Sequence, residues 1–167
     1  MKTLIAALAT LVPAVATADA SKPSDALAVL VGTWKGTGTL AMGKDKHKLD
    51  FTWACKPASA KSGVLCTLGM KGIPGLASYE ETDLFGYESN TDTYHWFSVT
   101  NAGETHDHAA TKGASFDKLQ FVFTGTQEGK PFKEVVDVTT SAKKVTVRSE
   151  TFVAGQSVAV LEGTGTK

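Results

Sequence analysis

The sequence carries no excess of charge of either sign, with 17 Lys and Arg residues against 17 Asp and Glu residues in a chain of 167. The Lys residues are dispersed, so the chain lacks the basic stripe that supplies affinity for a phosphate backbone. A basic amphipathic helix, which would favour a membrane surface, is also missing. We therefore expect no nucleic acid among the partners of this protein.

Long apolar runs are equally scarce. The one that stands out covers residues 4–15, and it is too short to cross a bilayer. Small residues follow it in the A-x-A spacing that signal peptidase cuts, ending at Ala20 or, as the alternative, at Ala18. We predict a signal peptide at 1–20, a single domain at 21–167, and export to the periplasm or the medium with no membrane span.

Motifs of common catalytic centres are missing as well. The chain contains neither the Gly-x-Ser-x-Gly elbow of serine hydrolases nor the His-Glu-x-x-His zinc motif. The adjacent acids Glu80 and Glu81 fall on opposite faces of an expected strand, so they cannot act as a catalytic pair there. These absences predict that the protein is not an enzyme.

Cysteine occurs only twice, as Cys55 and Cys66. Two cysteines in an exported chain favour one disulfide, and a hairpin between these positions brings them together. Two buried free thiols are the alternative.

What the chain does contain is a series of short strands. Turn signals such as Gly43-Lys44 and Glu128-Gly129 recur nine times and delimit ten strands. A short helix is expected before them at 24–31, since Ser24 can cap its start and Gly32 can end it. The pattern predicts an all-β, roughly ten-stranded antiparallel up-and-down barrel, closed at one end by the helix.

Alternation along the second and third strands fixes an expected register. If Cys55 pairs with Cys66, Trp53 lies opposite Leu68 and Phe51 lies opposite Met70. Apolar side chains then gather on one face, which predicts the interior of the barrel.

Three segments resemble a known family: Leu30 to Gly38, with its Gly-x-Trp-x-Gly-x-Gly core, Leu84-Phe85-Gly86-Tyr87, and Tyr94-His95-Trp96-Phe97. They are similar to a bacterial family of unknown function, the one numbered fifteen seventy-nine, which looks like a distant member of the calycins. That group includes lipocalins, fatty-acid-binding proteins and haem-binding nitrobindins. The resemblance implies a β-barrel with a cavity, and Trp34 is expected to pack as a plug at the closed end.

A barrel interior of this kind predicts a binding protein for a small apolar or amphipathic ligand. The cofactor, the ligand itself and the oligomeric state are left open by the sequence. The residues expected to contact the ligand are aromatic and come from three of the expected strands: Phe51, Trp53, Phe97, Phe121 and Phe123.

Three histidines suggest an alternative, a metal- or haem-binding protein. A two-residue loop at Ala102-Gly103 would place His95, His106 and His108 on one face, within reach of one Zn or Cu ion. No carboxylate is expected on that face, and solvated or cavity-lining histidines would show the same pattern. Nitrobindin-like relatives hold haem through a His near the C-terminus, whereas this chain has no His after His108.

A third hypothesis is a protein-protein interaction module, such as an inhibitor of secreted enzymes. Small periplasmic inhibitors also use disulfide-stapled barrels with a Gly-x-Trp-like start. This chain lacks an obvious reactive N-terminal arm, so the sequence favours the ligand-binding hypothesis over this one.

Overall fold

The structure is a computed structural model that describes residues 23–58, 61–111, 115 and 117–167. The predicted signal peptide at 1–20 lies outside the described residues. The chain begins with α1 (Pro23–Ala26) and a 3-10 turn, η1 (Leu27–Leu30), and then forms ten strands. These are β1 (Gly32–Met42), β2 (Asp45–Ala58), β3 (Gly63–Lys71), β4 (Tyr79–Glu88), β5 (Thr93–Thr100), β6 (Thr105–Ala110), β7 (Lys118–Gln127), β8 (Lys130–Thr140), β9 (Lys144–Val153) and β10 (Gln156–Thr166).

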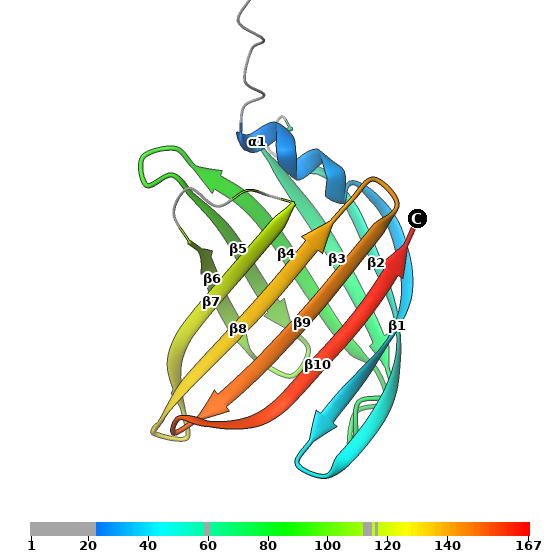
Figure 1. The fold of residues 1–167 in the computed structure, drawn as a ribbon, viewed down its shortest axis with the longest axis vertical. Helices are drawn as coiled ribbons and strands as arrows, with labels where there is room; N and C mark the ends of the chain where they lie inside the picture. The colour runs from blue at the N-terminus through cyan, green and yellow to red at the C-terminus, as the bar shows by residue number, and fades with distance from the viewer. Residues whose placement is uncertain (1–22, 59–60, 112–114, 116) are drawn as a thin grey trace, which may run out of the picture.

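Each strand pairs antiparallel with its neighbours in sequence, and β1 pairs with β10, so the sheet closes into a barrel (Figure 1). The predicted ten-stranded up-and-down barrel with a short N-terminal helix is confirmed. The ladder is shortest between β6 and β7, where only Ala109 with Val122 and Ala110 with Phe121 are in register among the described residues. In the part of the chain that the structure describes, no helix has the length and apolar character needed to cross a membrane.

Two glycines of β1 allow the barrel to close. A Cβ atom on Gly36 would lie 2.7 Å from the Cα of Gly165 on β10 and would overlap the carbonyl oxygen of Thr164. A Cβ atom on Gly38 would likewise lie 2.5 Å from the carbonyl oxygen of Glu162, too close for an ordinary contact. Glycine is therefore required at both positions, because a side chain would collide with the backbone of β10.

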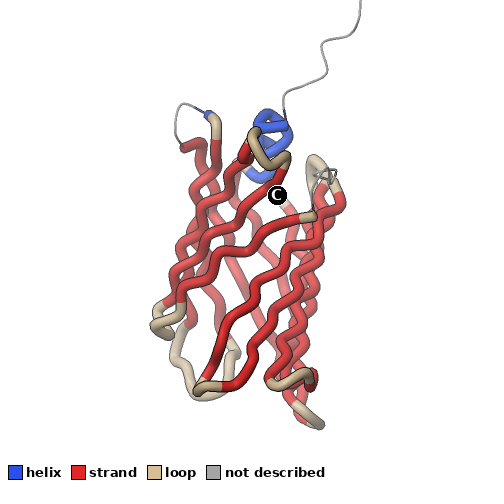
Figure 2. Tube along the Cα trace, turned by 90° about the vertical axis from the view of Figure 1, so that its left-hand side faces the viewer, coloured by secondary structure: helices blue, strands red, loops and turns tan. Residues whose placement is uncertain are grey.

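One end of the barrel is filled. Figures 1 and 2 place the helical segment at the same end as the C-terminus. Leu27 and Leu30 are buried there against Trp34, whose indole Nε1 donates a hydrogen bond to the carbonyl of Leu30 at 2.8 Å. The Nζ of Lys167 binds the carbonyls of Val29 and Val31, which ties the last residue to the helical segment. The predicted packing role of Trp34 is confirmed.

The predicted disulfide is present between Cys55 on β2 and Cys66 on β3. The two residues are directly paired, with Trp53 opposite Leu68 and Phe51 opposite Met70, as the alternation predicted. The bridge lies at the filled end, within the same core as Trp34.

Reduction of this disulfide should lower the melting temperature. A loop that spans 11 positions contributes on the order of 3 kcal/mol through the unfolded state. For a domain of this size, that loss corresponds to roughly 6–12 °C. Thermal unfolding with and without reductant measures the effect, and a Cys55→Ala, Cys66→Ala double variant insensitive to reductant serves as control. Free thiols that titrate in the unreduced native protein would contradict the prediction.

Candidate functional site

The interior of the barrel is divided between a packed aromatic core and a cavity. Trp53, Phe85, Trp96 and Phe121 pack together near the middle, with Phe85 and Trp96 ring centroids 5.1 Å apart. Beyond them lies a cavity of about 330 Å³, directed away from the helical segment. Part of its wall is apolar and comes from five strands: Phe51, Leu68, Met70, Val136, Val147 and Leu161.

An acidic column on β4 forms one polar side of the interior. Tyr79, Glu81 and Asp83 alternate along the strand and point inward, and the first two line the cavity. The hydroxyl of Tyr79 donates to Glu81 Oε2 at 3.0 Å. Asp83 is fully buried and accepts hydrogen bonds from two indoles, Trp53 Nε1 at 2.8 Å and Trp96 Nε1 at 2.7 Å.

Burial controls the protonation of this column. Burial and the adjacent Asp83 carboxyl raise the pKa of Glu81 to about 9, so Glu81 is a neutral acid at pH 7. Burial also raises the pKa of Asp83, although hydrogen bonds from Glu81 and from the two indoles oppose that shift. Burial and the nearby Glu81 raise the pKa of Tyr79 far above its usual value. Tyr79 and Glu81 therefore offer neutral hydrogen-bonding groups to the cavity.

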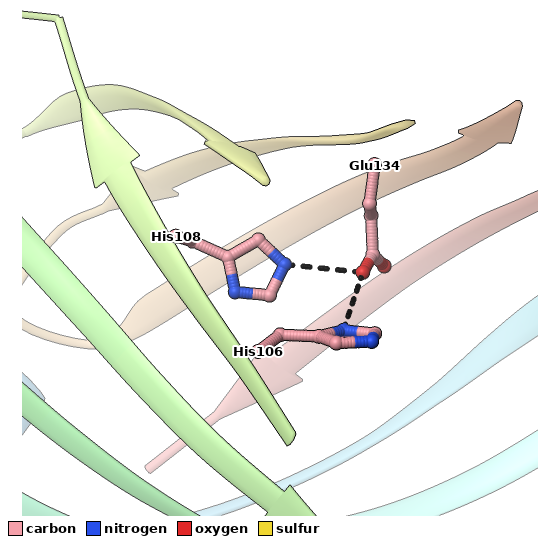
Figure 3. Close-up of side chains that lie close together, drawn as sticks. All are labelled: His106, His108 and Glu134. Atoms are coloured by element: carbon pink, nitrogen blue, oxygen red, sulfur yellow. Dashed lines mark hydrogen bonds and ion pairs between the residues drawn. The ribbon is translucent and has the colours of Figure 1, made fainter. Parts of the chain in front are cut away.

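A second polar cluster joins β6, β8 and β9. Glu134 Oε2 lies 3.0 Å from His108 Nε2 and 3.3 Å from His106 Nδ1, and the three side chains converge in Figure 3. Ser149 Oγ donates to the other oxygen of Glu134, Oε1, at 2.6 Å. All four residues line the cavity.

The hydrogen bonds of this cluster hold a charge inside the barrel. Burial by itself would raise the pKa of Glu134, but the hydrogen bonds with His106, His108 and Ser149 outweigh it and keep the pKa of this carboxyl well below its usual range. The same contact with Glu134 raises the pKa of His106. The cluster is therefore a carboxylate shared between two imidazoles.

The predicted triad of His95, His106 and His108 is wrong in one member. The β5–β6 hairpin pairs Val99 with Thr105, not with His106, and Gly103 takes a positive φ of 84° in a turn closed by Thr100 and Glu104. This slip of one residue puts His106 and His108 on the inner face with Ser98 and Trp96, opposite to the face of His95. His95 stays on the outer face, where its Nδ1 lies 3.2 Å from Asp107 Oδ1.

The residues expected to contact a ligand are found in three different places: on the cavity wall, in packed positions inside the barrel, and on the outer face. Phe51 and Trp53 line the cavity. Phe121 lies in the packed aromatic core, and Phe123 stacks on the ring of His106 with centroids 4.3 Å apart. Phe97 is on the outer face and 42% exposed, so its expected inward placement is wrong.

Glu134 was not singled out from the sequence, and Glu81 was considered only with Glu80 and set aside as a catalytic acid. The expectation of no carboxylate beside the histidines is wrong. The sequence does contain a sign that both carboxyl groups face inward, because each acid occupies a position that alternates with apolar residues along its strand. Glu134 alternates with Phe132 and Val136, and Glu81 alternates with Tyr79 and Phe85 through Asp83. An acid in the apolar phase of a strand indicates an inward carboxyl that needs a partner.

Comparisons with known proteins support the architecture. No protein-family model and no curated protein matches the chain. Among solved structures, Rv2717c from M. tuberculosis is similar with a TM-score of 0.64 and 12% identity, over 87% of this chain and 96% of that one. The S-type phycobiliprotein lyase CPES from Guillardia theta has a TM-score of 0.52 and 8% identity, over 84% and 89%. At such identities the likeness shows the fold, a calycin-like barrel.

Proposed function

We propose that this protein binds a small amphipathic molecule in the barrel cavity, and that the ligand is neutral or cationic. The observation that carries the proposal is the composition of the wall. Apolar side chains from several strands face Glu81 and Glu134, and among the described residues that line the cavity none is Lys or Arg.

The size of the cavity supports a small ligand. About 330 Å³ is at the lower end of the range for small-molecule sites, which is about 300–1,000 Å³. The wall also provides the few convergent polar groups that orient a ligand, namely the Tyr79 and Glu81 pair and the cluster around Glu134. Aliphatic and aromatic side chains supply the remaining contact area.

The charge of the wall disfavours an anion such as a fatty acid. A carboxylate head group would meet the ionised Glu134 and would find no cationic Lys or Arg among the described lining residues. An unpaired charge moved out of water into such a site costs several kcal/mol. A hydroxyl or amide head group meets the neutral Glu81, and an ammonium group meets the ionised carboxylate of Glu134.

We also include in this proposal where the protein is located and which family it belongs to. The leader-like residues 1–20 together with the Cys55–Cys66 disulfide favour an exported protein in an oxidising compartment. The Gly-x-Trp segment around Trp34 favours a divergent member of the family numbered fifteen seventy-nine. We also propose a role without catalysis, since the acids and histidines of the interior are engaged with one another.

Two fluorescent probes of opposite type test the ligand class. The neutral N-phenyl-1-naphthylamine should bind in the cavity at least about tenfold more tightly than the anionic 1-anilinonaphthalene-8-sulfonate, a difference of about 1.4 kcal/mol. Fluorescence titration measures both. Equal or tighter binding of the anion would contradict the proposed ligand class.

A pair of variants locates the binding. Leu161→Trp places a larger ring in the cavity. It should weaken binding of the neutral probe at least about tenfold, because the indole occupies the space that the probe needs. Val99→Trp adds the same ring to the outer face, where Val99 is exposed, and should leave binding unchanged. Equal losses in both variants, or no loss in either, would place the probe outside the cavity.

An interaction module remains the second candidate function. Leu84 and Phe97 are paired across β4 and β5 on the outer face, Val99 lies next along β5, and all three are exposed. This candidate would be favoured if neither probe binds and if the protein captures a secreted enzyme. The variant Phe97→Ser should then abolish that capture.

A further inference from the structure

We propose that His106, His108 and Glu134 form a binding site for a divalent transition-metal ion on the wall of the cavity. This inference goes beyond the proposed binding of an amphipathic molecule and does not depend on it. It also differs from the site suggested by the sequence, since Glu134 takes the place of His95.

The distances between the donor atoms fit one ion. Two ligand atoms about 2.1 Å from a metal lie roughly 3.0 Å apart at a right angle and roughly 3.4 Å apart at the tetrahedral angle. Glu134 Oε2 lies 3.0 Å from His108 Nε2 and 3.3 Å from His106 Nδ1. One donor atom from each residue lies within 4.8 Å of the other two. The side chains therefore need little movement to surround an ion.

Outer contacts hold two of the three ligands in the orientation that coordination needs. Ser149 Oγ donates to Glu134 Oε1 and leaves Oε2 directed at the histidines. His108 Nδ1 faces the carbonyl of Trp96 at 3.4 Å, which favours a proton on Nδ1. An ion would then take the place of the Nε2 proton that is shared with Glu134, and Nε2 would coordinate it. Such contacts are typical of metal-bound histidines and carboxylates.

Packing fixes the third ligand. The ring of His106 stacks on that of Phe123, with centroids 4.3 Å apart and planes 17° apart. It also lies against the ring of Phe132, with centroids 5.5 Å apart. A ring held on both of these neighbours cannot rotate freely, so its Nδ1 stays directed at Glu134. Rigid support of this kind lowers the cost of assembling a metal site.

The donor set selects the kind of metal. Two imidazole nitrogens and one carboxylate oxygen suit Zn²⁺, Fe²⁺, Co²⁺ or Cu²⁺, whereas Ca²⁺ and Mg²⁺ prefer sets of oxygen ligands alone. Cys55 and Cys66 are bonded to each other, so thiolates do not contribute. Three protein ligands leave at least one coordination position, and because all three residues line the cavity, that position faces its interior.

Cobalt provides a direct test on untagged, purified protein. Co²⁺ alone should bind with one-to-one stoichiometry and produce visible absorption bands between roughly 500 and 650 nm, as expected for a four- or five-coordinate site of nitrogen and oxygen ligands. It should also quench tryptophan fluorescence, since Trp96 lies with its ring 5.4 Å from that of His108.

Variants connect the signal to the three residues. His108→Ala and Glu134→Gln should each weaken Co²⁺ binding at least about 100-fold, because loss of a ligand exceeds the loss of an outer contact. Ser149→Ala, which removes only a positioning contact, should weaken it about 10-fold or more. His95→Ala is the matched control on the outer face and should bind Co²⁺ as the parent does. Circular dichroism and thermal melts show whether each variant is folded.

Several outcomes would overturn the proposal. Absence of Co²⁺ binding by the folded parent protein would show that the cluster is a hydrogen-bonded network only. Binding that Glu134→Gln leaves intact while folded, or that His95→Ala removes, would place the ion elsewhere. The neutral naphthylamine probe is titrated in parallel without metal, so failure of the metal site and failure of the proposed ligand cavity are separate results.

Discussion

Replacement of Trp34 by Ala is expected to destabilise the protein by about 3–5 kcal/mol, the usual cost of truncating a buried aromatic side chain. Trp34 has no exposed surface and lies between the helical segment and the barrel core. Removal of the indole leaves a cavity and an unpaired carbonyl at Leu30. Equilibrium unfolding in urea measures the free-energy difference.

A conservative variant separates packing from hydrogen bonding at this position. Trp34→Phe keeps most of the volume and loses the Nε1 bond to Leu30, so it should cost less than the Ala variant, by an amount that reflects the missing volume. A loss below about 1 kcal/mol for Trp34→Ala would mean that the helical segment does not close this end of the barrel in solution.

The second large effect is a loss of stability as the pH rises. Glu81 has an ordinary pKa of 4.5 in the unfolded chain and a pKa of about 9 in the fold. Between these values the folded protein binds a proton that the unfolded chain releases, so its contribution to stability is complete below pH 4.5 and declines toward pH 9. The decline is at most about 1.4 kcal/mol per pH unit.

Two other groups shape the profile. The pKa of Glu134 is lowered in the fold, so its contribution is present above pH 4.5 and is lost as the pH falls below that value. The pKa of His106 is raised, so its contribution is lost as the pH rises above about 6.5. We therefore expect maximal stability near pH 5.

The Glu81→Gln variant tests the assignment. It keeps an acceptor for the Tyr79 hydroxyl but cannot ionise, so the free energy of unfolding should fall less steeply between pH 5 and pH 8 than in the parent. Glu80→Gln, its exposed neighbour on the outer face, is the matched control and should retain the full slope. Identical slopes in the parent and in Glu81→Gln would mean that another group causes the decline.

The fold could be predicted because its signals are local. Alternating apolar residues such as Phe51 and Trp53 show their strand phase within a few positions, and turn residues separate one strand from the next. The pairing of Cys55 with Cys66 follows from the same alternation, since these residues share the phase of their strands. Each of these inferences uses residues that lie within one strand or one hairpin.

The face of β5 was harder to assign because both of its phases carry aromatic residues. Phe97 and Val99 compete with Tyr94 and Trp96 for the interior. The structure turns Trp96 inward, where Asp83 accepts its indole proton and Phe85 packs against its ring. The deciding contacts come from β4, and the sequence of β5 alone does not contain them.

The candidate site shows the same division. The sequence by itself determined a ten-stranded barrel, its closed end at Trp34, the disulfide, and the presence of histidines on β6, because strand period and turn chemistry act over a few residues. Only the tertiary structure decided that His106 and His108 face inward and that Glu134 meets them. The physical reason is that a turn longer by one residue reverses the face of a strand, and that Glu134 on β8 reaches the histidines of β6 across the intervening strand β7.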